Sequence, residues 1–213
     1  MTNEPDVFST QKPSEHEQSR DDFGAKLGMW LFLVTEILLF GGLFLAYSYM
    51  RARYPQEFHH AGMQLNATIG VANTFILLTS SLTLALGIVA TQRGEELRAR
   101  LLVGATILLG LIFLINKSFE WAAKIHHGIY PNSAHLATLP PGERIFFGLY
   151  FSMTGLHGLH VIAGLGVLAV ILVMMGRGSS HRGRYATLEN GGLYWHLVDV
   201  IWIFLLPLFY LAA

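Results

Sequence analysis

The 213-residue sequence contains no cysteine and few charged side chains. Its 14 basic and 14 acidic residues make up only 13% of the chain, against about 25% in a typical soluble domain. Without cysteine there is no disulfide, thiolate zinc site, iron–sulfur cluster or cysteine-bridged copper centre. The P-loop, the glycine-rich dinucleotide turn, HExxH and GxSxG are also missing. Because the charges balance to zero, no overall field attracts nucleic acid, and we expect no nucleic-acid partner.

Long apolar runs are what the sequence has instead, since 53% of its residues are hydrophobic. A hydrocarbon core about 30 Å thick is crossed by roughly 20 helical residues. Five runs reach that length, and a backbone that cannot bond to water favours helices. We therefore predict an all-α integral membrane protein, a bundle of five transmembrane helices at residues 27–49, 65–91, 101–125, 145–176 and 191–213.

Residues 1–23 differ from the rest of the chain, because they contain six acidic residues, two basic residues, two prolines and almost nothing apolar. Such a composition predicts a disordered polar segment before a transmembrane domain at residues 24–213. No cleavable signal peptide is expected, since the first apolar run has full transmembrane length. An odd number of helices also argues against an internally duplicated transporter.

The distribution of lysine and arginine predicts the orientation of the chain in the membrane. Three basic residues flank one side, namely Arg51, Arg53 and Arg144. The positive-inside rule places the other, richer side in the cytoplasm, so the N-terminus is predicted inside and the C-terminus outside. That side has nine basic residues: Lys12, Arg20, Lys26, Arg93, Arg98, Arg100, Arg177, Arg182 and Arg184.

One carboxylate lies deep inside the first apolar run, at Glu36. A charged side chain at the centre of a membrane helix costs about 2.5–3.5 kcal/mol on insertion scales, so Glu36 needs a reason to be there. It is a candidate proton site or a contact with a catalytic partner; a protonated carboxyl bonding between helices is the alternative that we favour. Gly41 and Gly42 follow closely and allow another helix to approach, so we expect Glu36 to face protein.

Three charges share one face of the third run, because Lys117, Glu120 and Lys124 are three and four residues apart. We favour a structural ion pair for this group, with a proton-handling role as the alternative.

Histidines occur in the fourth and fifth runs at helical spacing. His160 lies three positions after His157, and Asp199 lies three positions after His196. Two such histidines can bind one metal ion, but a haem or binuclear centre needs more buried imidazoles than these three. We therefore favour hydrogen bonds between helices over metal binding, and we expect no cofactor, metal site or catalytic residue in this chain.

Four blocks of sequence carry a resemblance to subunit III of the haem-copper respiratory oxidases, in the five-helix form found in bacteria. The HGLH and YWHLVDVIW patterns are the most specific, and together the blocks and the helix count cover nearly everything after residue 23. The blocks are GMWLFLVTEILLFGGLF at 28–44, FEWAAKIHHGIY at 119–130, TGLHGLHVIAG at 154–164 and YWHLVDVIWIF at 194–204.

The resemblance implies a role for each of the polar residues. Glu36 corresponds to the buried carboxylate of the family, and Glu120 to the acidic residue of its Glu-aromatic motif. The family's polar contacts between helices correspond to His157, His160, His196 and Asp199, and we expect Trp195 to make such a contact as well. None of these is a redox ligand in the family.

The resemblance also implies an accessory function, that of a non-catalytic subunit of a proton-pumping cytochrome c oxidase in an aerobic respiratory chain. Such a subunit stabilises the catalytic subunit and supports proton uptake or oxygen access, as a multi-pass protein of the bacterial inner membrane. Its partners would be subunits I and II, which hold the haems and copper, together with membrane lipid. A small subunit IV, bound phospholipid and a larger respiratory supercomplex are also compatible.

The sequence departs from the longer family form, which has seven helices with the first two splayed around a lipid-filled cleft. This chain lacks that pair, so lipid or another subunit would fill the place.

Two other functions remain open. One is an accessory subunit of a quinol oxidase or nitric oxide reductase. The relatives of this chain in those complexes often have Asp at the position of Glu36. The other is a stand-alone proton-coupled transporter using Glu36, Glu120 and Asp199 as a relay.

Overall fold

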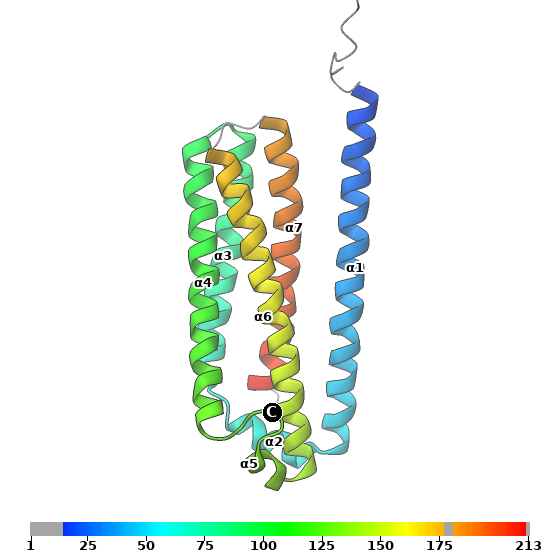
Figure 1. Cartoon of the computed structure of the whole chain (residues 1–213), viewed down its shortest axis with the longest axis vertical. Coiled ribbons are helices and arrows are strands. Elements are labelled where there is room, and N and C mark those ends of the chain that lie inside the picture. The colour runs from blue at the N-terminus through cyan, green and yellow to red at the C-terminus, as the bar shows by residue number, and fades with distance from the viewer. Residues whose placement is uncertain (1–14, 177–180, 212–213) are drawn as a thin grey trace, which may run out of the picture.

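The computed structural model describes residues 15–176 and 181–211, and every regular element in these two ranges is a helix. Five helices are long and apolar enough to cross a membrane, which confirms the predicted all-α fold and its five spans. Figure 1 shows four of them side by side as a bundle, with α1 standing at one side. The elements are α1 (Glu15–Arg53), α2 (Pro55–Met63), α3 (Ala67–Gln92), α4 (Glu96–His126), α5 (Ala134–Thr138), α6 (Pro141–Gly176), α7 (His181–Leu206) and a closing π-helical turn, η1 (Pro207–Leu211).

Helices continue beyond the apolar runs at several ends. Helix α4 begins before residue 101, and there Arg98 pairs with Glu95 at 3.0 Å and Arg100 with Glu96 at 3.2 Å. Such pairs, three or four residues apart, support a helix that hydropathy alone does not mark. Helix α7 likewise begins well before residue 191.

The two ends of the chain also differ from the predicted spans. Helix α1 begins at Glu15, so residues 15–23 of the segment predicted to be disordered are helical, whereas residues 1–14 lie outside the described ranges. The division of the chain at residue 23 stays a prediction. The last span does not run as one α-helix to residue 213, because Pro207 has no N–H to donate and η1 starts there.

Two short helices join the long ones at one end of the bundle, where the sequence predicts no element. Pro55 occupies the first turn of α2, a position that suits its fixed φ angle. The Ser133 side chain caps α5 by accepting from the Leu136 N–H at 3.1 Å, and Asn66 caps α3 in the same way. These are local signals that a search for long apolar runs does not detect.

A single tryptophan joins the four bundle helices. Trp195 of α7 is fully buried, and a Cβ added at Gly110 of α4 or Gly164 of α6 would lie 2.8 Å from its ring. Only glycine allows this approach. The indole N–H donates to Ser80 of α3 at 3.0 Å, so Trp195 fixes the spacing of all four helices.

Helix α1 meets the bundle along one narrow seam. Its buried apolar residues, Leu33, Phe40 and Tyr47, recur every seven residues, as on a coiled-coil face. In the most apolar stretch of each span, 11% of the residues are buried in α1 and 50% in α7. A Cβ at Gly41 or Gly42 would meet nothing within 4 Å in the described part of the chain, so the predicted close approach of another helix at these glycines does not occur here.

Candidate functional site

Glu36 faces the bundle, where it meets His160 of α6. The Glu36 Oε2 and His160 Nε2 atoms are 2.8 Å apart, and the two side chains are only 12% and 14% exposed. The other ring nitrogen, Nδ1, lies 2.7 Å from the Leu156 carbonyl oxygen. Since a carbonyl only accepts, Nδ1 must carry a proton and donate it.

This geometry fixes how many protons the Glu36–His160 pair shares. With Nδ1 committed as a donor, the contact between Nε2 and Oε2 is a hydrogen bond only if one further proton lies between them. That proton makes either an imidazolium facing a carboxylate or a neutral imidazole facing a carboxylic acid. In both forms the pair is neutral overall, and one proton lies between the two side chains.

Two other polar contacts fasten α1 to the rest of the chain. Lys26 pairs with Glu189 at 3.3 Å near one end of the seam, and the Tyr47 hydroxyl donates to the Leu208 carbonyl near the other. The Glu36–His160 pair therefore lies between two anchors, with the Phe40 ring 5.4 Å from the imidazole.

A second polar cluster lies inside the bundle around Lys117. Its Nζ donates to Glu120 Oε2 at 3.1 Å, to the Tyr150 hydroxyl at 3.0 Å and to the Tyr210 hydroxyl at 2.7 Å. Both tyrosines in turn donate to Glu120 Oε1, at 2.7 and 2.5 Å. Lys117 and Glu120 are buried, and all three N–H groups of the ammonium are used. We call these four residues the Lys117 cluster.

The third charge predicted on that face has a different partner. Lys124 donates to the Gln64 carbonyl at 2.6 Å, whereas the ion pair of this face joins Lys117 to Glu120. Lys124 and Glu120 both line a cavity of about 480 Å³ between α3 and α4, with Asn116 and His127.

Three side chains of α7 bond to hydroxyls of α3. Trp195 donates to Ser80, Trp202 donates to Thr74 at 3.0 Å, and His196 Nδ1 lies 2.5 Å from Ser81 Oγ. The serines and threonines of α3 thus serve as partners between helices.

His157 and Asp199 behave differently from the other polar residues of these blocks. Both are buried, yet neither the imidazole nitrogens nor the carboxyl oxygens have a hydrogen-bond partner among the described residues. The His157 ring instead meets Phe113 edge to face and lies tilted against Trp202, with ring centroids 5.6 and 5.2 Å away. Ser81 lies beside the Asp199 carboxyl, but its hydroxyl is engaged by His196. Among the described residues His157 therefore makes no hydrogen bond between helices, whereas Asp199 lies beside Ser81 of α3.

Several polar residues of the structure have no signal in the sequence. Tyr150 and Tyr210 come from α6 and η1, far from Lys117 along the chain, so no local spacing pairs them with it. The same is true of buried Glu143, whose Oε1 lies 2.9 Å from His60 Nδ1 on α2. In residues 15–176 and 181–211 no three His, Cys, Asp or Glu residues are grouped so as to hold a metal ion.

Comparison with known proteins points to one family. A family model described as cytochrome c oxidase subunit III matches residues 6–213. A cytochrome c oxidase subunit 3 from Thermostichus vulcanus is 32% identical over 200 residues, which cover 93% of this chain and 92% of the relative. A protein of the same name from Corynebacterium diphtheriae is 31% identical over 183 residues, 83% and 82% of the two chains. A heme-copper oxidase subunit I+III from Aeropyrum pernix is 29% identical over 215 residues, 97% of this chain but 25% of that longer protein.

Proposed function

The chain belongs to the cytochrome c oxidase subunit III family, and on that premise we propose that it is the non-catalytic subunit III of a proton-pumping cytochrome c oxidase in an aerobic respiratory chain. It is a multi-pass membrane protein, which we place in a bacterial inner membrane. In this role it stabilises the catalytic subunit and supports proton uptake or oxygen access. The haems and copper belong to its partners.

The fused relative supports subunit I as a direct partner. In the Aeropyrum pernix protein, whose name joins subunits I and III, a segment similar to this chain is part of one longer polypeptide. The outer face of α1 offers a surface for such a contact, since Trp30, Leu38 and Leu45 are exposed and Gly41 and Gly42 are open. We further propose subunit II, a small subunit IV, bound phospholipid and a larger respiratory supercomplex as partners.

The proposed orientation places the N-terminus in the cytoplasm. The start of α1, the α3–α4 connection, the end of α6 and the start of α7 lie at one end of the bundle in Figure 1. Lys26, Arg93, Arg98 and Arg100 belong to this end, which supports it as the cytoplasmic one under the positive-inside rule.

The observation that carries the proton-related part of the proposal is the Glu36–His160 pair. Ionisable side chains inside a membrane span are expensive to insert and commonly mark proton paths, so an ionisable pair between two helices is a candidate proton site. Glu36→Gln keeps the size of the side chain and leaves an amide that donates to Nε2, but it removes the proton that the pair can exchange. The change therefore separates proton exchange from helix contact.

The experiment compares the oxidase carrying Glu36→Gln with the oxidase carrying Glu143→Gln. Glu143 is a matched control, because it is also a buried carboxyl bonded to a histidine but lies away from the α1 seam. We expect both complexes to assemble and to start turnover at similar rates, while only Glu36→Gln slows proton uptake or loses activity during turnover. Equal behaviour of the two variants, or failure of Glu36→Gln to assemble, would show that the pair is structural.

A further inference from the structure

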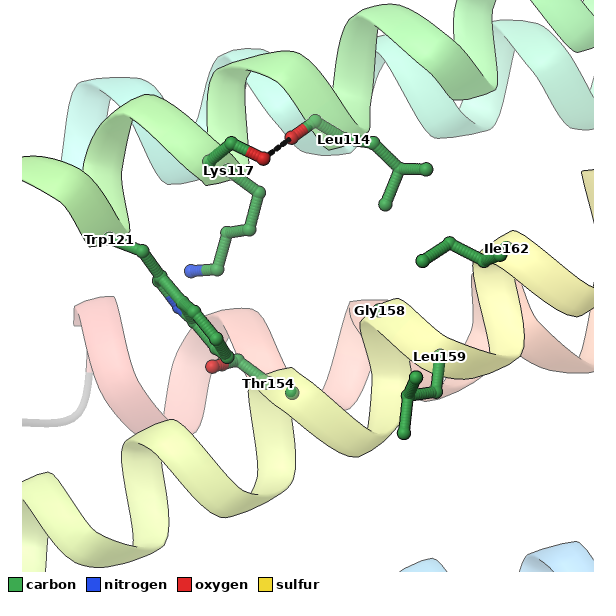
Figure 2. A pocket seen from close by; sticks show the side chains of 9 residues that line it. Leu114, Lys117, Trp121, Thr154, Gly158, Leu159 and Ile162 are labelled. Atoms are coloured by element: carbon green, nitrogen blue, oxygen red, sulfur yellow. Dashed lines mark hydrogen bonds between the residues drawn. The ribbon is translucent and has the colours of Figure 1, made fainter. Parts of the chain in front are cut away.

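A groove lies between α4 and α6, away from the seam with α1. Its volume is about 390 Å³. Figure 2 shows Trp121 and Thr154 toward one end of the groove and Leu114 and Ile162 toward the other. The residues that line it are Leu114, Lys117, Ser118, Trp121, Thr154, Gly155, Gly158, Leu159 and Ile162.

The groove opens toward the membrane. Two of its apolar lining side chains, Leu159 and Ile162 of α6, are exposed. Both helices are spans that cross the bilayer, so the phase next to these side chains in a membrane is hydrocarbon. An apolar hollow on such a surface is filled by the acyl chains of lipids rather than by water.

Two glycines of α6 make the groove hollow. A Cβ at Gly158 would meet nothing within 4 Å in the described residues, so open space lies in front of it. A Cβ at Gly155 would lie 2.9 Å from the Trp121 ring, which closes the groove on that side.

The polar groups of the lining have little bonding capacity left. Lys117 uses all three N–H groups within the Lys117 cluster. The hydroxyls of Ser118 and Thr154 donate to carbonyls of their own helices, at 2.8 and 2.6 Å. Of the lining side chains, only Trp121 keeps an unpartnered polar atom, its indole nitrogen. That nitrogen is itself buried, so the groove offers a ligand no free donor, and a ligand that suits it is hydrocarbon.

We propose that this groove binds one fatty acyl chain of a membrane phospholipid. The eight-residue rise from Thr154 to Ile162 spans about 12 Å, close to the roughly 15 Å of hydrocarbon in one leaflet. Trp121 lies near His126, where α4 ends. The acyl chain therefore enters the groove beside Trp121 and runs toward the bilayer centre. The inference rests on the membrane role of the proposed function and gives its bound lipid a defined site.

Trp121 provides the probe for the first test. The full-length chain is reconstituted in phosphatidylcholine bilayers whose acyl chains carry bromine, a short-range quencher of indole fluorescence. Trp30, which is 59% exposed on α1, is replaced by Phe, and Trp195 and Trp202 are shielded by burial. The remaining quenching then reports hydrocarbon beside Trp121.

The variants compared are Gly158→Leu and Gly166→Leu. Leucine at 158 fills the groove, whereas leucine at 166 lies on the same helix outside the lining, also with open space before its Cβ. We expect Gly158→Leu to lose most of the quenching of Trp121 and Gly166→Leu to retain it. Absence of quenching in the parent, or equal quenching in both variants, would overturn the proposal.

A second test uses the chain in its native membrane. A photoreactive benzoylphenylalanine in place of Leu159 is expected to give an adduct with the mass of a phospholipid. An adduct with another polypeptide would show that a partner fills the groove, which overturns this inference and leaves the oxidase function intact. Conversely, loss of the oxidase partners would refute the proposed function and leave the quenching result unchanged.

Discussion

Helix α1 and the bundle of α3, α4, α6 and α7 are held in different ways. The bundle encloses Trp195 between two glycines and contains the Lys117 cluster, in which every donor of the ammonium has a partner. Helix α1 has one seam of buried residues and a proton-sharing pair, and most of its surface is exposed. Hydrophobic burial gives little drive between helices in lipid, so close packing and polar contacts decide which helices stay together. In its most apolar stretch α1 is the least buried of the five spans, 11% against 28–50% in the bundle helices, so it has the most surface left for another chain.

The largest effect is expected from breaking the bundle at its buried charges. Lys117→Met leaves Glu120 as an uncompensated buried carboxylate, and removing one partner of such a pair costs about 3–5 kcal/mol. The free energy of unfolding in mixed detergent micelles measures this loss. Lys124→Met is the control, because its amine bonds to a backbone carbonyl at the edge of the bundle. Similar values for the two variants would mean that the Lys117 cluster does not stabilise the fold.

Overpacking beside Trp195 is expected to have the next largest effect. Gly110→Ala places a methyl group 2.8 Å from the indole, and such strain costs about 1–3 kcal/mol. Gly104→Ala on the same helix meets nothing within 4 Å in the described chain and should be neutral or slightly stabilising. Thermal melting of the two variants measures the difference. A tolerated Gly110→Ala would show that Trp195 does not set the helix spacing.

A smaller effect is expected when the seam itself is weakened. Glu36→Leu removes the hydrogen bond to His160, and contacts of this kind in membranes are worth about 0.6–1.7 kcal/mol. Hydrogen exchange should rise along α1 while the bundle helices keep their protection. Ile37→Ala, at an exposed position one residue along, is the control. Faster exchange throughout the bundle would contradict the separation of the two regions.

The smallest effect is expected at the ion pair near the start of α1. Lys26 and Glu189 are 53% and 32% exposed, and such pairs contribute about 0–1 kcal/mol. Lys26→Ala should leave the exchange of α1 nearly unchanged, and added salt should reduce even that difference. A change larger than that of Glu36→Leu would place the main anchor of α1 at this pair.

The features that depend on composition could be predicted from the sequence. Uncharged runs of sufficient length predict five spans, and the structure has five. Glu36 faces protein and meets His160, although the close helix approach at Gly41 and Gly42 on which that prediction rests does not occur. The helix ends could not be predicted as well, because capping by Asn66 and Ser133 and the ion pairs before residue 101 lie outside the apolar pattern.

The features that depend on contacts between distant segments could not be predicted. Lys117 and Glu120 are three residues apart and form an ion pair, but Tyr210 reaches them from the far end of the chain. His157 carries the same spacing signal as His160, yet one lies against aromatic rings and the other bonds across helices. Which way a side chain turns depends on the packing of the bundle, and helical spacing does not contain that information.

The measurement that tests the central claim most directly is a spectrum of what this chain binds. The chain is tagged, extracted gently from its native membrane, and examined by a reduced-minus-oxidised difference spectrum together with the proteins that accompany it. We predict haem bands and a large polytopic partner, with band positions that separate a cytochrome c oxidase from quinol oxidases and nitric oxide reductases. A colourless preparation without a partner would contradict its function as an oxidase subunit.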